Sequence, residues 1–156
     1  MAETLEKIST LSDMKTLMSE LQRLEKKFLY DFYGALQDFS AKKILPQLLA
    51  RNKITSVFVS EKGTDILKKI SVSKRYSVVV YDLETVDMNG LEFLAEVEKA
   101  PDLKSRCKVI LATPKLNMEA QAKLKHLGAA AFVVKPMEAE TLRLALEKIG
   151  VVINAN

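Results

Sequence analysis

Four residues of this 156-residue chain could together support phosphoryl-transfer chemistry, and each lies at or just after an apolar stretch. Asp38 and Asp82 are carboxylates, and two carboxylates could hold Mg²⁺, which also keeps some of its waters. A free oxygen of Asp82 could then act as a nucleophile. Thr113 could donate a hydrogen bond to an incoming phosphoryl oxygen, and Lys135 could neutralise the charge of the phosphoryl group. Phosphoryl transfer requires little beyond such positioning and charge cancellation.

These residues can meet only if the segments that precede them form one sheet. From residue 33 onward, apolar runs alternate with amphipathic stretches, which predicts an α/β fold with a parallel sheet covered on both faces. In such a sheet, ligands bind beyond the carboxyl ends of the strands. The expected strands are 33–39, 55–60, 77–82, 108–113 and 130–135. The expected helices are 40–52, 64–72, 90–100, 118–128 and 138–150.

Two prolines bear on these helices. Pro46 lies inside the first helix, where it removes a backbone hydrogen bond and should kink the helix. Pro101 should stop the third helix at residue 100, because proline cannot continue an α-helix without losing a hydrogen bond.

The first thirty residues follow a different pattern. Apolar residues spaced three and four apart form a heptad seam, namely Met14, Leu17, Leu21, Leu24 and Phe28. Two heptads are too short for a stable isolated coiled coil, so the seam must pack on the chain's own body or on the same helix of a partner. We therefore expect an N-terminal amphipathic helical extension over residues 1–31 and a domain over residues 32–150.

The composition excludes several classes of function. The net charge of +4 comes from lysines spread along the chain without a block of five, so no nucleic-acid partner is expected. No stretch reaches the ~18 apolar residues of a membrane span and the N-terminus does not resemble a secretion signal, so we expect a cytoplasmic protein without membrane attachment. Cys107 and His126 are the only residues of their kinds, which leaves no internal disulfide or Cys/His metal set. Cys107 is expected to be buried and His126 to lie on a helix face.

Taken in order, these motifs resemble the receiver domains of bacterial two-component response regulators, in particular the single-domain chemotaxis regulators. "QDFS" (37–40) stands where the family has an acidic pair, and "YDLETVDMNGLEFL" (81–94) matches the phosphoacceptor strand and its turn. "LAT" (111–113) and "GAAAFVVKP" (128–136) match the two later strands of the site. The resemblance covers residues 33–149 and implies a flavodoxin-like, doubly wound (βα)5 fold with strand order 2-1-3-4-5 and an extra N-terminal helix.

The resemblance also implies a metal side of the site. Asp82 would be the phosphoacceptor, and Asp38 and the backbone carbonyl of Glu84 would bind Mg²⁺ with it. Gln37 replaces the first acid of the usual pair, so it could orient a metal-bound water but would weaken Mg²⁺ binding. Val86 replaces a common proline in the turn, which bears on the rigidity of the loop.

The remaining implied roles concern the phosphoryl group and the switch. Thr113 would be the switch hydroxyl, and Lys135 the phosphate partner, joined to Pro136 by a cis bond. Phe132 occupies the position of the family's rotating aromatic and lacks a hydroxyl. Pro114 stands where the family usually has a small residue whose N–H donates to the phosphoryl group, so one donor is lost.

Two interpretations follow. In the favoured one, the chain is a receiver that takes a phosphoryl group from a histidine kinase or phosphotransfer protein and signals to a downstream protein target, with no enzymatic activity beyond its own phosphorylation and dephosphorylation. In the alternative, it is a pseudoreceiver that binds partners independently of phosphorylation. A phosphatase of the haloacid-dehalogenase type is not favoured, because Glu84 stands where such enzymes need an Asp. No output domain follows the last helix, so the chain is expected to act by binding a partner or to be a fragment of a longer protein.

Overall fold

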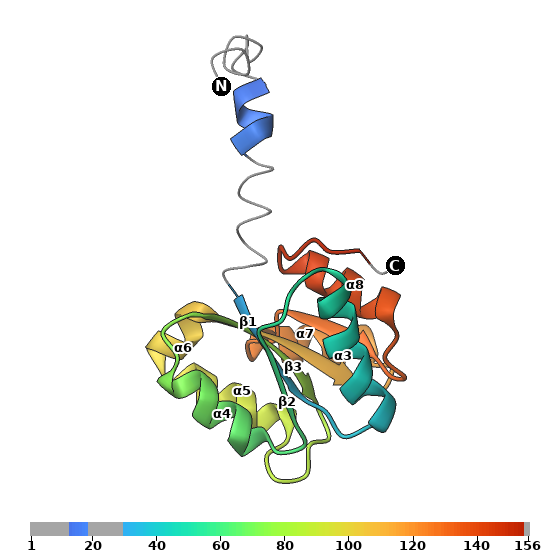
Figure 1. The fold of residues 1–156 in the computed structure, drawn as a ribbon. Coiled ribbons are helices and arrows are strands. Elements are labelled where there is room, and N and C mark those ends of the chain that lie inside the picture. The colour runs from blue at the N-terminus through green and yellow to red at the C-terminus, as the bar shows by residue number, and fades with distance from the viewer. Residues whose placement is uncertain (1–12, 19–29, 155–156) are drawn as a thin grey trace.

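A five-stranded parallel sheet forms the centre of the protein, in a computed structural model that describes residues 13–18 and 30–154 (Figure 1). The strands lie in the order β2-β1-β3-β4-β5, and each neighbouring pair is parallel. Their bounds are β1 Tyr30–Ala35, β2 Val57–Ser60, β3 Tyr76–Asp82, β4 Cys107–Thr113 and β5 Ala131–Val134. The fold class and strand order predicted from the sequence are confirmed.

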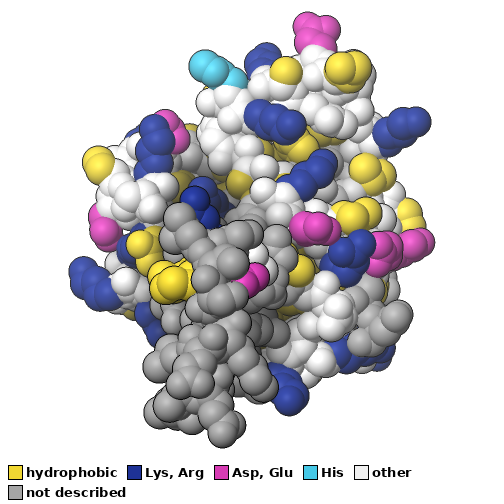
Figure 2. All heavy atoms as spheres, turned by 90° about the horizontal axis from the view of Figure 1, so that it is seen from above, with side chains coloured by type: hydrophobic (Ala, Val, Ile, Leu, Met, Phe, Trp, Pro, Cys, Tyr) yellow, Lys and Arg dark blue, Asp and Glu magenta, His cyan; other side chains and the backbone are white. Residues whose placement is uncertain are grey.

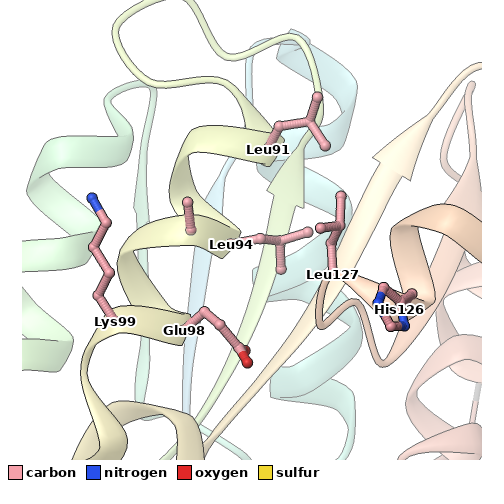
Figure 3. Close-up of a pocket in the computed structure, with 7 residues that line it drawn as sticks. Leu91, Leu94, Glu98, Lys99, His126 and Leu127 are labelled. Atoms are coloured by element: carbon pink, nitrogen blue, oxygen red, sulfur yellow. The ribbon is translucent and has the colours of Figure 1, made fainter.

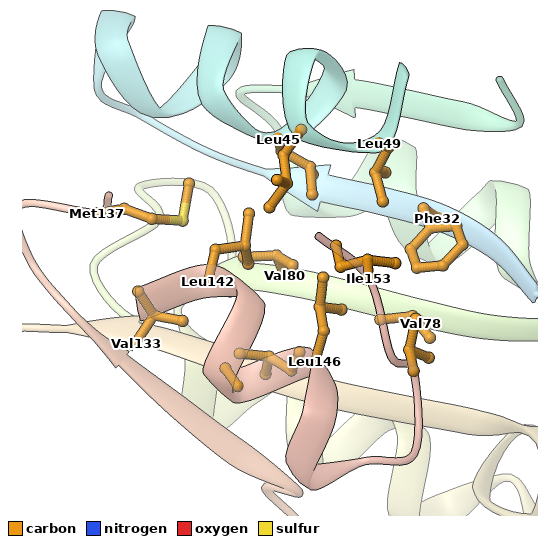
Figure 4. Close-up of a cluster of buried hydrophobic side chains, with 14 of the residues drawn as sticks. Phe32, Leu45, Leu49, Val78, Val80, Val133, Met137, Leu142, Leu146 and Ile153 are labelled. Atoms are coloured by element: carbon orange, nitrogen blue, oxygen red, sulfur yellow. The ribbon is translucent and has the colours of Figure 1, made fainter. Parts of the chain in front are cut away.

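Helices cover both faces of this sheet (Figure 1). Their bounds are α3 Phe39–Arg51, α4 Gly63–Val72, α5 Gly90–Lys99, α6 Pro101–Arg106, α7 Met118–His126 and α8 Ala139–Lys148. Buried side chains of α3 and α8 pack on one face, in the cluster shown in Figure 4. Side chains of α4, α5, α6 and α7 pack on the other face.

The central strand β3 shows why this sheet is buried on both sides. Val78 and Val80 point into the core on the α3 and α8 side, whereas Val79 and Tyr81 point into the opposite core. This alternation follows from the two-residue period of a strand. Because Asp82 is the last residue of this strand, its carboxylate lies at the edge of the sheet where the parallel strands end.

The first strand differs from the prediction of 33–39. β1 covers Tyr30–Ala35, so Asp38 lies beyond the strand, at the N-cap position of α3. The early start was not predicted because Asp31 interrupts the apolar pattern. That carboxylate is accommodated at the start of the strand, where Oδ1 accepts hydrogen bonds from Ser56 Oγ (2.6 Å) and Arg75 Nε (3.0 Å).

The two prolines have different outcomes. Helix α3 continues through Pro46 to Arg51. Helix α5 ends before Pro101 as predicted, but Pro101 then starts the short helix α6, which was not predicted. Proline is well tolerated at the first position of a helix, because its missing N–H has no partner there in any case.

The N-terminal seam is described only in part. Residues 13–18 are helical, and Met14 and Leu17 are 53% and 45% exposed in the single chain. Packing on the domain body is therefore not seen for these two residues, and the dimer alternative remains a prediction. The seam residues Leu21, Leu24 and Phe28 lie outside the described residues.

Charged side chains of both signs are interspersed on the face seen in Figure 2. On the visible part of that face, Lys and Arg are spread among Asp and Glu and do not gather into one patch. No helix within residues 13–18 and 30–154 has the length and apolar character needed to cross a membrane.

Candidate functional site

Asp82 is the centre of the candidate site. It is the last residue of β3 and only 1% exposed, although its side chain is a carboxylate. Its Oδ1 atom accepts a hydrogen bond from the backbone N–H of Glu84 (2.9 Å) and forms an ion pair with Lys135 Nζ (2.7 Å). A buried carboxylate is costly unless it is paired in this way.

Lys135 follows β5 and reaches the same edge of the sheet from a different strand. Its Nζ also lies 3.7 Å from Glu84 Oε2, so one ammonium group contacts two carboxylates. Burial acts to lower the pKa of Lys135. The hydrogen bond and charge of Asp82, followed by the charges of Asp38 and Glu84, outweigh burial and raise that pKa. The Lys135–Pro136 peptide bond is cis, as the resemblance implied.

Asp38 comes to this edge from the N-cap of α3. Its side chain makes no capping hydrogen bond to the helix, and its charge acts on Lys135. Gln37 is turned toward the loop after β2, where its Nε2 donates to the backbone carbonyl of Glu61 (2.7 Å). Lys42 of α3 also pairs with Glu61. Asp38 thus lies near enough to Lys135 for its charge to act there, whereas the amide nitrogen of Gln37 is hydrogen-bonded to the loop after β2.

The two residues that were predicted to act as a switch lie on β4 and β5. Thr113 ends β4 and is 1% exposed, but its hydroxyl donates to the carbonyl of the exposed Pro114 (3.0 Å). Its backbone carbonyl accepts from the Lys135 N–H (2.9 Å), which joins β4 to the start of the last loop. Phe132 lies on β5 and is partly buried against the core on the α5 side.

Several polar contacts of the loop between β3 and α5 were not predicted. Thr85 is 2% exposed, and its hydroxyl donates to the Asp82 carbonyl (2.6 Å). Asp87 accepts hydrogen bonds from the first residues of α4, Gly63 and Thr64. The spacing of Thr85 three residues after Asp82, in an acidic turn, could have suggested a side chain that closes the turn. The partners of Asp87 lie 23 and 24 residues away, and local spacing gives no signal for them.

The donor set of this edge suits Mg²⁺. The carboxylates of Asp38 and Asp82 and the backbone carbonyl of Glu84 are hard oxygen ligands, and Mg²⁺ in proteins is usually held by one or two carboxylates plus waters. No group of three or more His, Cys, Asp or Glu side chains within the described part of the chain could hold a metal ion. A Mg²⁺ ion bound here would have the two carboxylates and the Glu84 carbonyl as protein ligands, and waters would complete its coordination.

Two further candidates lie away from the site. Cys107 is buried, as predicted, and burial raises the pKa of its thiol to about 12, so it is not a nucleophile at neutral pH. His126 ends α7 and is exposed. It borders a hollow of about 420 Å³ between α5 and the end of α7, which Leu91, Leu94 and Leu127 also line (Figure 3).

The chain matches the family of response regulator receiver domains over residues 37–147. It is 25% identical to chemotaxis protein CheY1 of Helicobacter pylori over 115 residues, which are 74% of this chain and 90% of that protein. It is also 27% identical to a protein-glutamate methylesterase/protein-glutamine glutaminase of Treponema denticola over 119 residues. That match covers 70% of this chain and 32% of the Treponema protein, so the chain spans about a third of that relative's length.

Solved structures share the fold. The chemotaxis response regulator CheY4 of Vibrio cholerae superposes with a TM-score of 0.67 at 22% identity, covering 76% of this chain and 96% of that one. The bacteriophytochrome response regulator RtBRR superposes with a TM-score of 0.65 at 24% identity, covering 80% of both chains. These likenesses agree with the parallel sheet and its strand order.

Proposed function

This chain belongs to the response regulator receiver domains of two-component signalling, and we propose that it accepts a phosphoryl group on Asp82. The observation that carries the proposal is the buried Asp82 carboxylate at the end of β3, with the Lys135 ammonium group 2.7 Å from Oδ1. Receiver domains generally bind Mg²⁺ at their acidic site. Here Asp38, Asp82 and the Glu84 carbonyl would hold it, with Gln37 acting through water.

The chemistry is a displacement at phosphorus. Lys135 and the Glu84 N–H both contact Oδ1 of Asp82, which leaves Oδ2 as the attacking oxygen. A new O–P bond forms, and the bond from phosphorus to the histidine nitrogen of a kinase or to the oxygen of acetyl phosphate breaks. The leaving group takes the electron pair, and Asp82 becomes an acyl phosphate. Lys135 neutralises the phosphoryl charge, and bound Mg²⁺ would supply further charge neutralisation.

Two departures from the family's usual residues should slow this reaction. Gln37 carries no charge and its amide nitrogen is bound to Glu61, so the metal side has one negative charge fewer than usual. Pro114 has no N–H, so the backbone after Thr113 offers the phosphoryl group no donor at this position. The resting Thr113 hydroxyl donates to the Pro114 carbonyl and must rotate to reach a phosphoryl oxygen.

Intact-mass measurement after incubation with Mg²⁺ and acetyl phosphate tests the proposal. We expect one phosphoryl adduct on the wild-type chain and none on Asp82→Asn or after chelation of the metal. Gln37→Asp should tighten Mg²⁺ binding, and Pro114→Ala should restore the missing donor and speed adduct formation. If only the Gln37→Asp/Pro114→Ala double variant forms the adduct, the chain is a pseudoreceiver. If the double variant also stays inert, the assignment of these residues to one phosphoryl site is wrong.

The partners follow from the same proposal. Receiver domains interact with histidine kinases or phosphotransfer proteins and with downstream targets, and we propose both kinds of partner for this chain. We also propose that residues 1–31 form a helical extension to a domain of residues 32–150, and that this extension can pair two copies. Light scattering of the full chain and of a chain starting near residue 30 should then give a dimer and a monomer. If the two chains instead have the same oligomeric state, the extension does not pair two copies.

A further inference from the structure

Asp87 joins the loop after Asp82 to a helix that lies elsewhere in the sequence. Its Oδ1 accepts from the Gly63 N–H (2.9 Å), and its Oδ2 accepts from the Thr64 N–H (3.2 Å) and the Thr64 hydroxyl (2.8 Å). The N-cap position of α4 is Lys62, whose side chain makes no capping bond. The cap that helices usually take from their own first residues therefore comes here from the β3–α5 loop.

Packing around Tyr81 also holds the β3–α5 loop against α4. Tyr81 is fully buried, its ring stacks on Phe93 at 4.3 Å between centroids, and its hydroxyl donates to the Met88 carbonyl. Gly63 lies directly against Tyr81, because a Cβ atom there would overlap the hydroxyl oxygen and come within 2.8 Å of the ring carbon that bears it. The absence of a side chain at Gly63 thus lets α4, the loop and β3 approach one another closely.

The same loop carries the atoms that face Asp82. At its start, the Glu84 N–H donates to the Asp82 carboxylate and the Thr85 hydroxyl donates to the Asp82 carbonyl. Near its end, Asp87 accepts a hydrogen bond from α4, and the Met88 carbonyl accepts one from Tyr81 of β3. Val86, between these two anchors, is 91% exposed and stands where the receiver family commonly has a proline. Polar contacts on both sides of Val86 therefore restrain this loop, in place of the proline ring that commonly restricts the backbone at this position in the family.

We propose that Asp87 is a positioning residue of the phosphoryl site, which holds the β3–α5 loop against the start of α4 and so fixes the Glu84 backbone carbonyl beside Asp82. This inference rests on the proposed function, since that carbonyl is a proposed Mg²⁺ ligand. Asp87 does not touch the site itself and acts through the loop. Outer partners of this kind orient metal ligands in many proteins, and their loss weakens metal binding.

Mg²⁺ titrations of the full chain, followed by amide NMR, test the inference. Asp87→Ala should raise the Kd for Mg²⁺ about 10-fold, the lower end of what the loss of an outer partner costs. The matched control is Asn52→Ala, which also removes three hydrogen bonds, to Leu48 and Asn154, from a buried position outside the candidate site. The control should leave the Kd unchanged. Val86→Pro should restore much of the lost affinity in the Asp87→Ala background, because proline restricts the loop independently of Asp87.

Amide hydrogen exchange gives a readout that does not need the metal. If Asp87 holds the loop, Asp87→Ala should speed exchange of the Glu84 and Thr85 amides as well as those of Gly63 and Thr64. If only Gly63 and Thr64 exchange faster, or if the Kd is unchanged, Asp87 is a helix cap alone and the inference is overturned. If the wild-type chain binds no Mg²⁺, the proposed metal site fails, and exchange at Glu84 and Thr85 still decides whether Asp87 holds the loop.

Discussion

The two sides of the Asp82 site are held very differently. One side, which we call the clasped half, consists of the start of α4 (Gly63 and Thr64) and the loop of residues 83–89. Hydrogen bonds join these two segments to each other and the loop to β3. On the other side, which we call the open half, residues 113–128 start at the last residue of β4 and include α7. Within α7 only Leu124 is buried, and the hollow of about 420 Å³ separates the helix end from α5 (Figure 3).

This difference in packing predicts a different role for each half. A metal ligand that is held in place before the metal binds costs less to order on binding, and the clasped half holds the loop that carries the proposed Glu84 carbonyl ligand. A segment with few buried apolar contacts opens locally at low free energy, and the open half has this property. If Asp82 accepts a phosphoryl group as proposed, we expect α4 to stay in place and residues 113–128 to change conformation.

The largest expected effect comes from breaking the clasped half. Gly63→Ala puts a methyl group against the buried Tyr81 ring, and overpacking of this kind costs about 1–3 kcal/mol of the free energy of unfolding. Chemical denaturation measures the loss. Tyr81→Phe removes the oxygen that the methyl group would overlap, so the double variant should recover part of it. A Gly63→Ala chain as stable as the wild type would show that the packing at this point is loose.

A smaller effect is expected from Asp87→Asn, which keeps the shape of the side chain and removes its charge. Although burial acts to raise it, the hydrogen bonds from Gly63 and Thr64 hold the pKa of Asp87 below its usual 3.8. The ionised form thus favours the folded state, and this contribution is present above pH 3.8 and lost as the pH falls through the lowered value. At neutral pH the variant should lose about 1 kcal/mol, because an amide nitrogen in place of Oδ2 cannot accept the hydrogen bonds from the Thr64 N–H and hydroxyl.

Denaturation at a series of pH values checks this second prediction. The stability difference between wild type and Asp87→Asn should shrink as the pH falls below 3.8. A difference that stays constant down to lower pH would mean that the charge of Asp87 does not contribute to the clasped half.

The smallest global effect is expected from removing the cap of α7 in the open half. The Asn117 side chain accepts from the Ala120 N–H (2.7 Å), as a cap normally does. Because α7 is weakly anchored, Asn117→Ala should speed amide exchange within α7 but change global stability by less than about 0.5 kcal/mol. If it lowers global stability as much as Asp87→Asn does, the two halves are equally rigid and the comparison fails.

The sequence predicted the sheet well because its signal is local. The run Val78–Val80 could be assigned to a strand from its residue types alone, and the order of the strands followed from the family resemblance. The start of β1 was wrong because Asp31 interrupts the pattern, and its partner Arg75 lies 44 residues away. The helix α6 was overlooked because Pro101 was taken only as the end of α5, although the same residue can begin a helix.

The positions of the candidate site residues, though not their roles, were predicted in part. Asp82 and Thr113 end apolar strands, and their position at one edge follows from a parallel sheet. The contacts that set the site's geometry could not be derived in this way. The bond from Gln37 to Glu61 and the bonds from Gly63 and Thr64 to Asp87 join segments brought together only by the packed structure. No periodic pattern in the sequence encodes such pairs.

Amide NMR of the full chain with Mg²⁺ and beryllofluoride, an analogue of the phosphoryl group, tests the central claim most directly. We expect the wild-type spectrum to change and the Asp82→Asn spectrum to remain unchanged. In the wild type, the largest shifts away from Asp82 should fall within residues 113–128, while Gly63 and Thr64 should shift little. An unchanged wild-type spectrum, or the same change in Asp82→Asn, would contradict the assignment of Asp82 as the phosphoacceptor.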